Sequence, residues 1–234
     1  MDSEHVLTSD FAPVAALLAD RARAAMLTAL LDGRPLAAGE LARTAGVSAP
    51  TASAHLARLL DGGLVTVVRQ GRWRYYRLKG ADVAQVIEAL SQISPPVRVR
   101  SLRQSRDARR LHMARTCYDH LAGEAGVSLF AALVDGGLIE PDGGETYEVT
   151  GKGEERLGAL GLDVAALRKT RRRFAWHCLD WTERRPHLNG ALGAALTDRM
   201  IELGWFERGT TRRALTVTEA GLKGLADSFG CVLP

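Results

Sequence analysis

The chain has 234 residues, of which 46% are hydrophobic and 25% charged, a balance typical of a globular protein that buries a core. It has no apolar run of about 18 residues, which excludes a membrane-spanning helix. Its acidic N-terminus also lacks the pattern of a secretory signal. We therefore expect a cytoplasmic protein with no membrane partner. Three scattered cysteines without Cys-x-x-Cys spacing exclude a zinc ribbon and a disulfide framework.

The net charge of +4 is too small to indicate a nucleic-acid partner by itself, but the basic residues are grouped along the chain. Residues 69–79 contain five basic side chains and no acid, and residues 98–115 and 168–173 are also strongly basic. Because salt screens distant charges, such local groups determine how strongly a polyanion binds. For the segment 98–115, a solvated helix face is the commoner alternative.

The spacing of apolar residues predicts two helices within residues 11–31, followed by a Gly-Pro stop. A short helix is expected from Leu36 to Ala45. A further helix follows Ser48, which is a favourable N-cap, and it runs to about Asp61 before Gly62-Gly63.

The periodicity then changes from helical to alternating. Residues 64–68 and 73–78 predict two strands joined by a turn at 69–72, and residues 82–93 predict another helix. The segment Ser94-Pro95-Pro96 breaks that helix and is the best linker candidate. Helices, a helix-turn-helix and then a hairpin are the order of elements in a winged helix.

Four short motifs follow one another between residues 48 and 78. They read Ser-x-x-x-x-Ser-x-His-Leu from Ser48, Gly-Leu-Val from Gly63, Arg-x-Gly-Arg from Arg69 and Tyr-Tyr-x-Leu from Tyr75. In these motifs the chain resembles the ArsR-type transcription repressors, over about residues 11–93. The resemblance implies a winged helix-turn-helix that binds double-stranded operator DNA as a homodimer and represses transcription.

A recognition helix contacts base edges with residues near its N-terminus, while the wing contacts the backbone or a neighbouring minor groove. We therefore expect the DNA contacts to come from Ser48, Thr51, Ala52, Ser53, His55, Arg58, Arg69, Gln70, Arg72 and Arg74. For His55, packing inside the domain is an equally weighted alternative. The helices at 11–19 and 82–93 are more apolar than a small winged core needs, so we assign them to the dimer interface.

The C-terminal half contains an internal repeat. His120-Leu121-Ala122-Gly123 recurs as His187-Leu188-Asn189-Gly190, and Val149-Thr150-x-x-Gly153 recurs as Val217-Thr218-x-x-Gly221. Each copy predicts a helix-plus-hairpin unit of winged-helix type. The expected fold is mainly α with small antiparallel β-hairpins (α+β). It comprises a winged-helix domain at 1–93, a basic linker or helix at 94–116 and a C-terminal effector or dimerisation domain at 117–234, with repeats at about 117–165 and 176–234.

ArsR-type repressors are often metal sensors, and the resemblance points to two places for ligands. One is a Cys-x-Cys on the helix before the recognition helix, where this chain has Glu40–Thr44 without cysteine. The other is an Asp-x-His and a His-x-x-Glu on the dimer helix, where residues 82–93 contain no histidine. Both sites are missing from this sequence.

A different metal site is suggested by cysteine and histidine pairs farther along the chain. Cys117 and His120 have the spacing of one helix face, and His177 and Cys178 are expected on a second helix with Asp180. Two cysteines and two histidines suit a soft divalent metal ion. The alternative is structural, because buried cysteines are ordinary small apolar residues more often than ligands. His120 also recurs as His187, which favours a structural position.

Two other effectors are open. A small organic molecule would need an aromatic pocket, for which we name Tyr118, Phe174, Trp176, Trp181 and Trp205, although these side chains equally suit a core. Oxidation of Cys117 or Cys178 is the other. The sequence has no Gly-rich phosphate loop, Gly-x-Ser-x-Gly or His-Glu-x-x-His, so we expect neither an enzyme nor an established cofactor. The alternative function is a protein that binds a partner protein through its winged helices without specific DNA binding.

Overall fold

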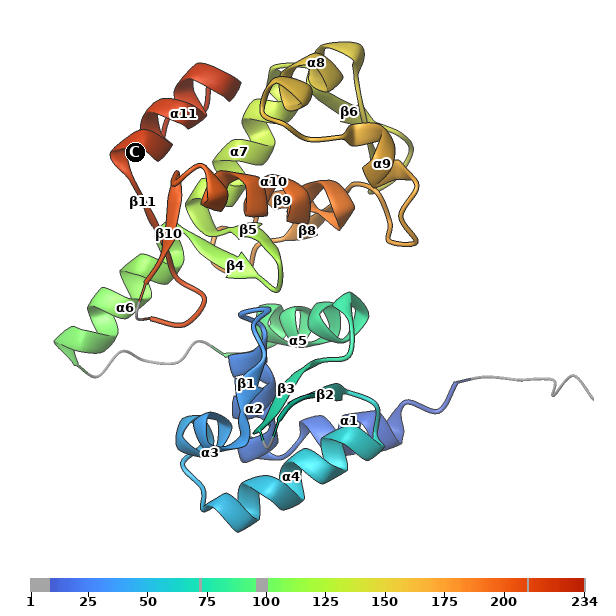
Figure 1. Ribbon diagram of the computed structural model, residues 1–234, viewed down its shortest axis with the longest axis vertical. Helices are drawn as coiled ribbons and strands as arrows, with labels where there is room; N and C mark the ends of the chain where they lie inside the picture. The colour runs from blue at the N-terminus through green and yellow to red at the C-terminus, as the bar shows by residue number, and fades with distance from the viewer. Residues whose placement is uncertain (1–8, 72, 96–100, 210, 234) are drawn as a thin grey trace, which may run out of the picture. The chain divides into compact units, whose positions relative to one another are not determined.

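The computed structural model describes residues 9–71, 73–95, 101–209 and 211–233 (Figure 1). They form two compact units, one up to Ile87 and one from Glu88 onward, so the boundary falls inside a single helix. Among the described residues, no helix is long and apolar enough to cross a membrane. The predicted wing residue Arg72 lies outside the described residues.

The first unit has the element order of a winged helix. Its helices are α1 (Ala12–Leu18), α2 (Arg21–Leu30), α3 (Ala38–Ala45), α4 (Ala49–Asp61) and the first part of α5 (Ala81–Ile93). Its antiparallel sheet has the order β1-β3-β2, from β1 (Leu36–Ala37), β2 (Val65–Gln70) and β3 (Trp73–Leu78). The predicted helix from Leu36 begins only at Ala38, because Leu36 and Ala37 pair with Tyr76 and Tyr75 of β3.

Local sequence explains where α4 begins and ends. Ser48 is extended and its side chain accepts a hydrogen bond from the backbone N–H of Thr51 at 3.3 Å, which caps the helix. Pro50 lies in the first turn, where its missing N–H costs nothing. The helix ends at Asp61 with Gly62 as its C-cap, and Gly63 follows with a positive φ. The N-cap and Pro50 confirm the prediction for this helix.

The second unit starts with the end of α5 and with α6 (Leu102–Met113). Two segments follow with the same order of elements, hairpin, helix, hairpin, helix. The first comprises β4 (Arg115–Cys117), β5 (His120–Ala122), α7 (Gly123–Asp135), β6 (Ile139–Pro141), β7 (Tyr147–Val149) and α8 (Gly151–Ala159), and then an additional short helix α9 (Val164–Arg168). The second comprises β8 (Trp176–Leu179), β9 (Pro186–Asn189), α10 (Gly190–Glu202), β10 (Phe206–Arg208), β11 (Leu215–Val217) and α11 (Glu219–Phe229).

The hairpin that opens each segment corrects the prediction of helices at these places. Cys117 and His120 are not on one helix, because they face each other across the β4–β5 hairpin. Two residues separate them in a turn where Tyr118 has a positive φ. A spacing of three brings side chains together in such a hairpin as well as on a helix, so the sequence pattern fitted both. His177 and Cys178 likewise belong to the strand β8.

The two segments pack on each other's hairpins. Helix α7 of the first contacts β9 of the second, and α10 of the second contacts β5 of the first. Glycines let each helix lie close to its own hairpin: a Cβ on Gly126 would lie 2.5 Å from the Leu121 carbonyl oxygen, and one on Gly193 would lie 2.6 Å from that of Leu188. From the same two positions, the nearest atoms of the other segment would be Cβ of His187 at 3.6 Å and Cβ of His120 at 3.4 Å. The resulting core is continuous through both segments and includes Leu121, Leu129, Leu133, Leu188, Leu192, Leu196, Trp205, Phe206 and Leu225. The likeness of each segment to a winged helix stays a prediction.

Candidate functional site: a nucleic-acid interface and a cysteine–histidine cluster

Helix α4 has a buried face and an exposed face. Leu56 and Leu59 are fully buried and hold the helix on the first unit. Thr51, Ser53 and Arg58 are exposed, as contact with a groove requires. Ser48 is also exposed, and its oxygen caps the helix.

Two residues predicted on this DNA-reading surface lie elsewhere. Ala52 is 0% exposed, so the prediction that it touches bases is wrong: it faces the core one turn before Leu56. The side chain of His55 is only 15% exposed. Its Nδ1 lies 3.5 Å from Arg23 Nη1 and 3.7 Å from Asp20 Oδ1, at the start of α2. The contacts of His55 favour the packing alternative.

The β2–β3 hairpin carries a wing with like charges opposed. Arg69 pairs with Arg74 across the two strands, and Gln70 pairs with Trp73. All four residues are exposed. Like charges directly opposite each other destabilise a sheet, and a bound polyanion would relieve that repulsion. The geometry of the wing therefore suits a phosphate backbone.

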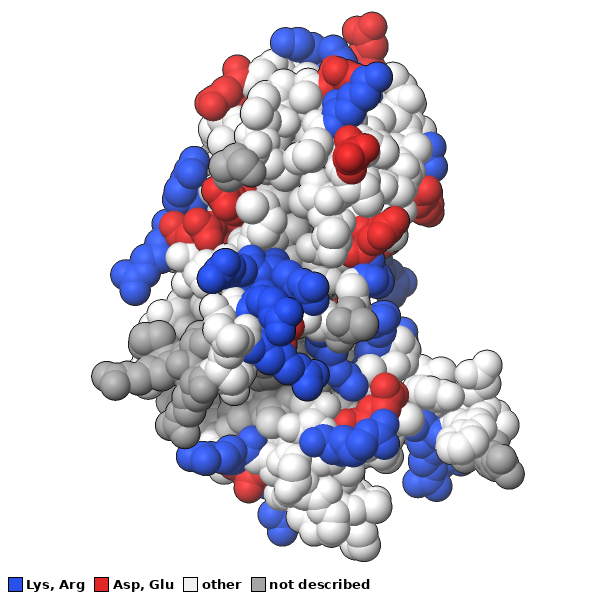
Figure 2. Space-filling view, turned by 90° about the vertical axis from the view of Figure 1, so that its left-hand side faces the viewer, with Lys and Arg blue, Asp and Glu red and all other residues white. Residues whose placement is uncertain are grey.

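The basic segment 98–115 divides into two kinds of residue. Within it, α6 has no buried residue, and Figure 2 shows lysine and arginine side chains gathered over this face of the second unit. Arg103, Arg106 and Arg110 line a cavity of about 490 Å³ there with Asp107. The exposed helix agrees with the solvated-face alternative. Arg115, in contrast, is 1% exposed and pairs with an acid in the interior.

Apolar side chains are exposed on α1 and α5. Phe11, the residue that precedes α1, is 78% exposed, and Val14 is exposed within that helix. Val86, Leu90 and Ile93 are 48%, 41% and 81% exposed and recur every three or four residues along α5. Such a spacing puts them in one stripe on the helix surface.

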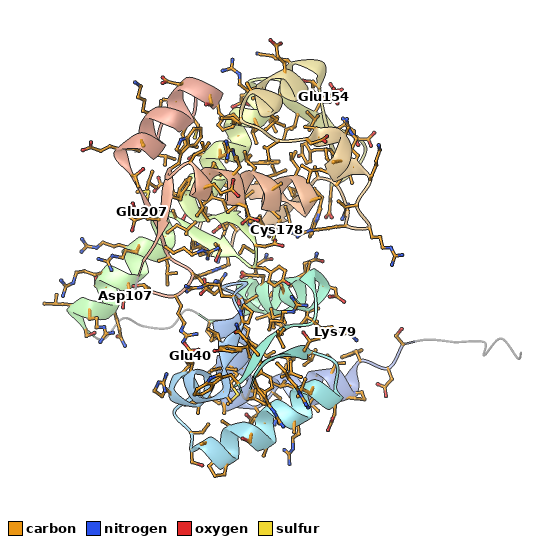
Figure 3. The ribbon with its side chains drawn as sticks, viewed as in Figure 1. Glu40, Lys79, Asp107, Glu154, Cys178 and Glu207 are labelled. Carbon is orange, nitrogen blue, oxygen red and sulfur yellow. The ribbon has the colours of Figure 1, made fainter. Side chains whose placement is uncertain are left out.

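The second unit contains a buried cluster of two cysteine and two histidine side chains, each of which can offer one ligand atom to a metal ion. The ligand-type atoms of Cys117, His120, Cys178 and His187 all lie within 4.8 Å of one another. Each hairpin supplies one pair directly across its strands, Cys117 with His120 and Cys178 with His187. The two imidazole rings stack with centroids 5.1 Å apart. Figure 3 shows Cys178 in the interior of the second unit, among the hairpins. We call these four residues the Cys–His cluster.

A carboxylate lies near Nδ1 of each histidine of the Cys–His cluster. Nδ1 of His120 lies 3.4 Å from Asp119 Oδ1, and Arg172 Nη2 donates to the same oxygen at 2.9 Å. Nδ1 of His187 lies 3.9 Å from Asp180 Oδ2. On the other side of the rings, His120 Nε2 and His187 Nε2 are buried and have no hydrogen-bond partner among the residues that the structure describes. His120, whose Nδ1 contacts a carboxylate while its Nε2 is free, therefore has the arrangement typical of a metal ligand. Asp180 is too far from Nδ1 of His187 to hold that ring by a hydrogen bond.

Burial and mutual contact shift the pKa values within the Cys–His cluster. The hydrogen bond with Cys178, followed by burial, raises the pKa of the Cys117 thiol well above its ordinary value. Burial, followed by the neighbouring His120, lowers the pKa of His187 well below its ordinary value. Burial would lower the pKa of His120, but its contacts with Cys117 and Asp119 outweigh burial and raise that pKa to about 9.

The structure brings together three of the four predicted ligands and replaces the fourth. His177 is not in the Cys–His cluster, because neighbouring residues of a strand point to opposite faces and Cys178 faces inward. The ring of His177 lies instead near Phe130 and Tyr147. The missed ligand is His187. The repeat of His120 at that position was the available signal, but it favours a structural role when read alone.

The aromatic residues of the predicted effector pocket have separate partners. Trp205 packs on Phe229 in the core, and Phe174 packs against the same core. Arg115 lies over the ring of Trp181, at 4.7 Å from the centroid, and Arg173 lies over the ring of Trp176. Tyr118 forms the turn of the first hairpin. A common pocket for these five side chains stays a prediction.

Comparison with known proteins gives relatives for both units. A family model described as "Helix-turn-helix domain" matches residues 18–68. The HTH-type transcriptional regulator YdfF of Bacillus subtilis is 44% identical over 215 residues, which are 92% of this chain and 95% of that protein. The arsenic resistance transcriptional regulator ArsR1 of Pseudomonas putida is 37% identical over 31% of this chain and 56% of its own length. A homodimeric winged helix-turn-helix DNA-binding domain from Mycobacterium bovis, solved by NMR, is 36% identical over 38% of this chain and 88% of that chain, with a TM-score of 0.32.

Proposed function

This chain belongs to the ArsR-type family of winged helix-turn-helix transcriptional regulators, and we propose that it is a homodimeric repressor that releases its operator when an effector binds. The observation that carries the proposal is the wing, where the exposed Arg69 and Arg74 oppose each other beside an α4 with an exposed polar face. A partner with closely spaced negative charges would compensate that arrangement.

The proposed reading of DNA follows from the size of the grooves. A helix such as α4 fits the major groove, where Thr51 and Ser53 would meet base edges and Arg58 a phosphate. The wing would add contacts to the backbone through Arg69, Gln70 and Arg74. Hydroxyl groups choose the sequence, whereas arginines at phosphates supply affinity for every sequence.

The proposed dimer uses the exposed apolar stripe of α5. One recognition helix contacts too few bases to select a site in a genome, and two half-sites solve that problem. Val86, Leu90 and Ile93 offer the apolar area that such an interface buries. Phe11 and Val14 add exposed apolar side chains at α1.

The test is selection of bound sequences from a random duplex library, followed by fluorescence anisotropy over a range of salt concentrations. We expect a two-fold symmetric sequence with half-sites separated by one helical turn, roughly 10 base pairs. Ala54→Glu places an acid on the exposed face of α4 and should abolish binding. Ala220→Glu makes the same charge change on the exposed face of α11 and should leave binding intact.

Two results would count against the proposal. One is the failure of the wild-type chain to enrich any sequence. The other is equal DNA affinity in Ala54→Glu and Ala220→Glu. Either would favour the alternative that the winged helix binds a partner protein.

A further inference from the structure

We propose that the Cys–His cluster binds a soft divalent metal ion such as Zn²⁺ and that this ion is the effector of the regulator, an inference that rests on the proposed function for its second half. The four ligands would be Sγ of Cys117 and Cys178 and an imidazole nitrogen of His120 and His187. The helix that precedes α4 and the dimer helix, where the family resemblance directed the search, contribute none of them.

The spacing of the four ligand atoms is close to that of a tetrahedral site. Zinc–sulfur and zinc–nitrogen bonds of about 2.3 and 2.0–2.1 Å place tetrahedral ligands roughly 3.3–3.8 Å from one another. The corresponding atoms of the Cys–His cluster lie within 4.8 Å of one another. Small side-chain rotations therefore suffice to close the site.

The unused lone pairs are the strongest reason to expect an ion here. His120 Nε2 and both ring nitrogens of His187 are buried, and no residue in the described part of the chain forms a hydrogen bond with them. Buried polar atoms are almost always hydrogen-bonded, because leaving one unpaired is costly. A metal ion would take one lone pair from each ring. Asp119 at Nδ1 of His120 would fix that ring with Nε2 toward the ion.

The charge balance of the Cys–His cluster also fits a divalent ion. Each thiol would lose its proton to solvent, and the two thiolates with Zn²⁺ would form a neutral complex. A neutral complex is the form that a buried site tolerates, since an uncompensated charge in the interior is expensive. Four protein ligands leave no open coordination position, so the site suits sensing or structure, as opposed to catalysis.

Backbone contacts connect the two cysteine-bearing strands to the end of α5. Gln92 Nε2 donates to the carbonyl oxygen of Leu179, the residue after Cys178, at 2.9 Å. Glu88 pairs with Arg213, whose Nε donates to the carbonyl oxygen of Thr116, the residue before Cys117, at 3.1 Å. An ion that draws β4 and β8 together would move both carbonyls that hold α5. Because α5 also carries the proposed dimer contacts, the ion would change the relative orientation of the two protomers in the DNA-bound dimer.

The metal site is tested by titrating the full-length, chelator-treated and reduced protein with Co²⁺. We expect the visible bands of tetrahedral cobalt and a thiolate-to-cobalt charge-transfer band that saturate at one ion per chain. Zn²⁺ should displace the cobalt. Cys178→Ser and His187→Asn should weaken binding at least tenfold. Cys231→Ser, a buried cysteine outside the cluster, and His177→Asn, on the opposite face of β8, should bind as the wild type does.

If the ligand variants do not fold, X-ray absorption of the zinc-loaded wild type still decides the question. A first shell of two sulfur and two nitrogen atoms supports the site. Absence of a tetrahedral cobalt spectrum from the reduced protein overturns it. Loss of binding in Cys231→Ser or His177→Asn but not in Cys178→Ser overturns the assignment of ligands.

The effector role is tested on the selected duplex with and without Zn²⁺. We expect the ion to weaken DNA binding by about tenfold or more, within the usual range of allosteric coupling. Equal affinity with and without Zn²⁺ overturns the effector role while the metal site stands. A chain that binds cobalt but no DNA in either state overturns the proposed function instead, so the two failures are distinguishable.

Discussion

Arg115 and Asp180 form an ion pair in the interior of the second unit, with Nη2 to Oδ2 at 2.8 Å and side chains that are 1% and 0% exposed. The same carboxylate accepts hydrogen bonds from the backbone N–H of Gly123 at 2.7 Å and of Thr182 at 2.8 Å. Burial alone would raise the pKa of Asp180, but Arg115, the Thr182 hydroxyl and the backbone N–H of Glu183 hold that pKa well below its ordinary value. The pair thus joins β4, the start of α7 and the loop after β8.

Removing the charge of Asp180 should therefore destabilise the second unit strongly. Asp180→Asn leaves the Arg115 guanidinium buried without a counter-charge, which costs about 3–5 kcal/mol. Urea unfolding in the presence of a chelator measures the loss without a contribution from metal. The control is Glu154→Gln, which breaks the exposed pair of Glu154 with Arg168 and should cost less than about 1 kcal/mol. Equal losses in the two variants would contradict the role of the buried pair.

Gly193 is a second position with a strict structural requirement, because the space beside its Cα is too small for a side chain. A Cβ there would lie 2.6 Å from the Leu188 carbonyl oxygen and 3.4 Å from Cβ of His120. Gly193→Ala must push backbone away from backbone, so we expect a loss of about 1–3 kcal/mol in the free energy of unfolding. Co²⁺ affinity should fall as well, because β9 and His120 move.

Gly158→Ala is the matched control for that change. Gly158 is in α8, and a Cβ there would meet nothing within 4 Å. Alanine at an unobstructed helical position should stabilise the chain by about 0.5–1 kcal/mol. Thermal unfolding of both variants measures the difference in sign. A neutral or stabilising effect of Gly193→Ala would show that α10 packs less tightly on its own hairpin than described.

The first unit was predictable because its local signals agree with one another. Ser48 and Pro50 start α4, Gly62 ends it, and alternation begins immediately afterwards. The burial of Ala52 and of His55 was harder to predict from the sequence. The pattern gives the period of a helix, but the face that turns inward also depends on what packs against it. For His55 these neighbours are Arg23 and Asp20 at the start of α2.

The Cys–His cluster was predictable in composition but not in geometry. Cys117 and His120 flank a tight turn, whereas Cys178 and His187 flank a longer loop that closes with a hydrogen bond from the N–H of Asp180 to the carbonyl of Arg185. Alignment by the histidines therefore places no cysteine opposite Cys117, although the structure makes Cys178 its counterpart. In the structure, each cysteine pairs with its histidine across the two strands of a hairpin. The sequence does not show this equivalence, because the two hairpin loops differ in length.

The apolar stripe on α5 predicts the effect of a charge on dimerisation. Ile93 is 81% exposed, so Ile93→Glu should not disturb the fold, but it would bury a carboxylate in the proposed interface. We expect the dimer dissociation constant to rise at least tenfold, as for a central interface residue. Sedimentation equilibrium measures it. Val232→Glu, at a side chain 79% exposed outside the helices, should leave the dimer unchanged. A wild type that stays monomeric at micromolar concentration would refute the interface.

The opposed arginines of the wing predict a specific change in salt dependence. Arg74→Ala leaves one phosphate per wing without its arginine, so binding to every duplex should weaken to a similar degree. The slope of log affinity against log salt should also fall by about one for each phosphate that is no longer neutralised.

Ser53→Ala is the complementary variant, since it removes a hydroxyl at the exposed start of α4 but no charge. It should change which bases are preferred and leave the slope as in the wild type. Anisotropy titrations over a range of salt concentrations with two duplexes separate these effects. An unchanged slope in both Arg69→Ala and Arg74→Ala would mean that the wing does not touch the DNA backbone.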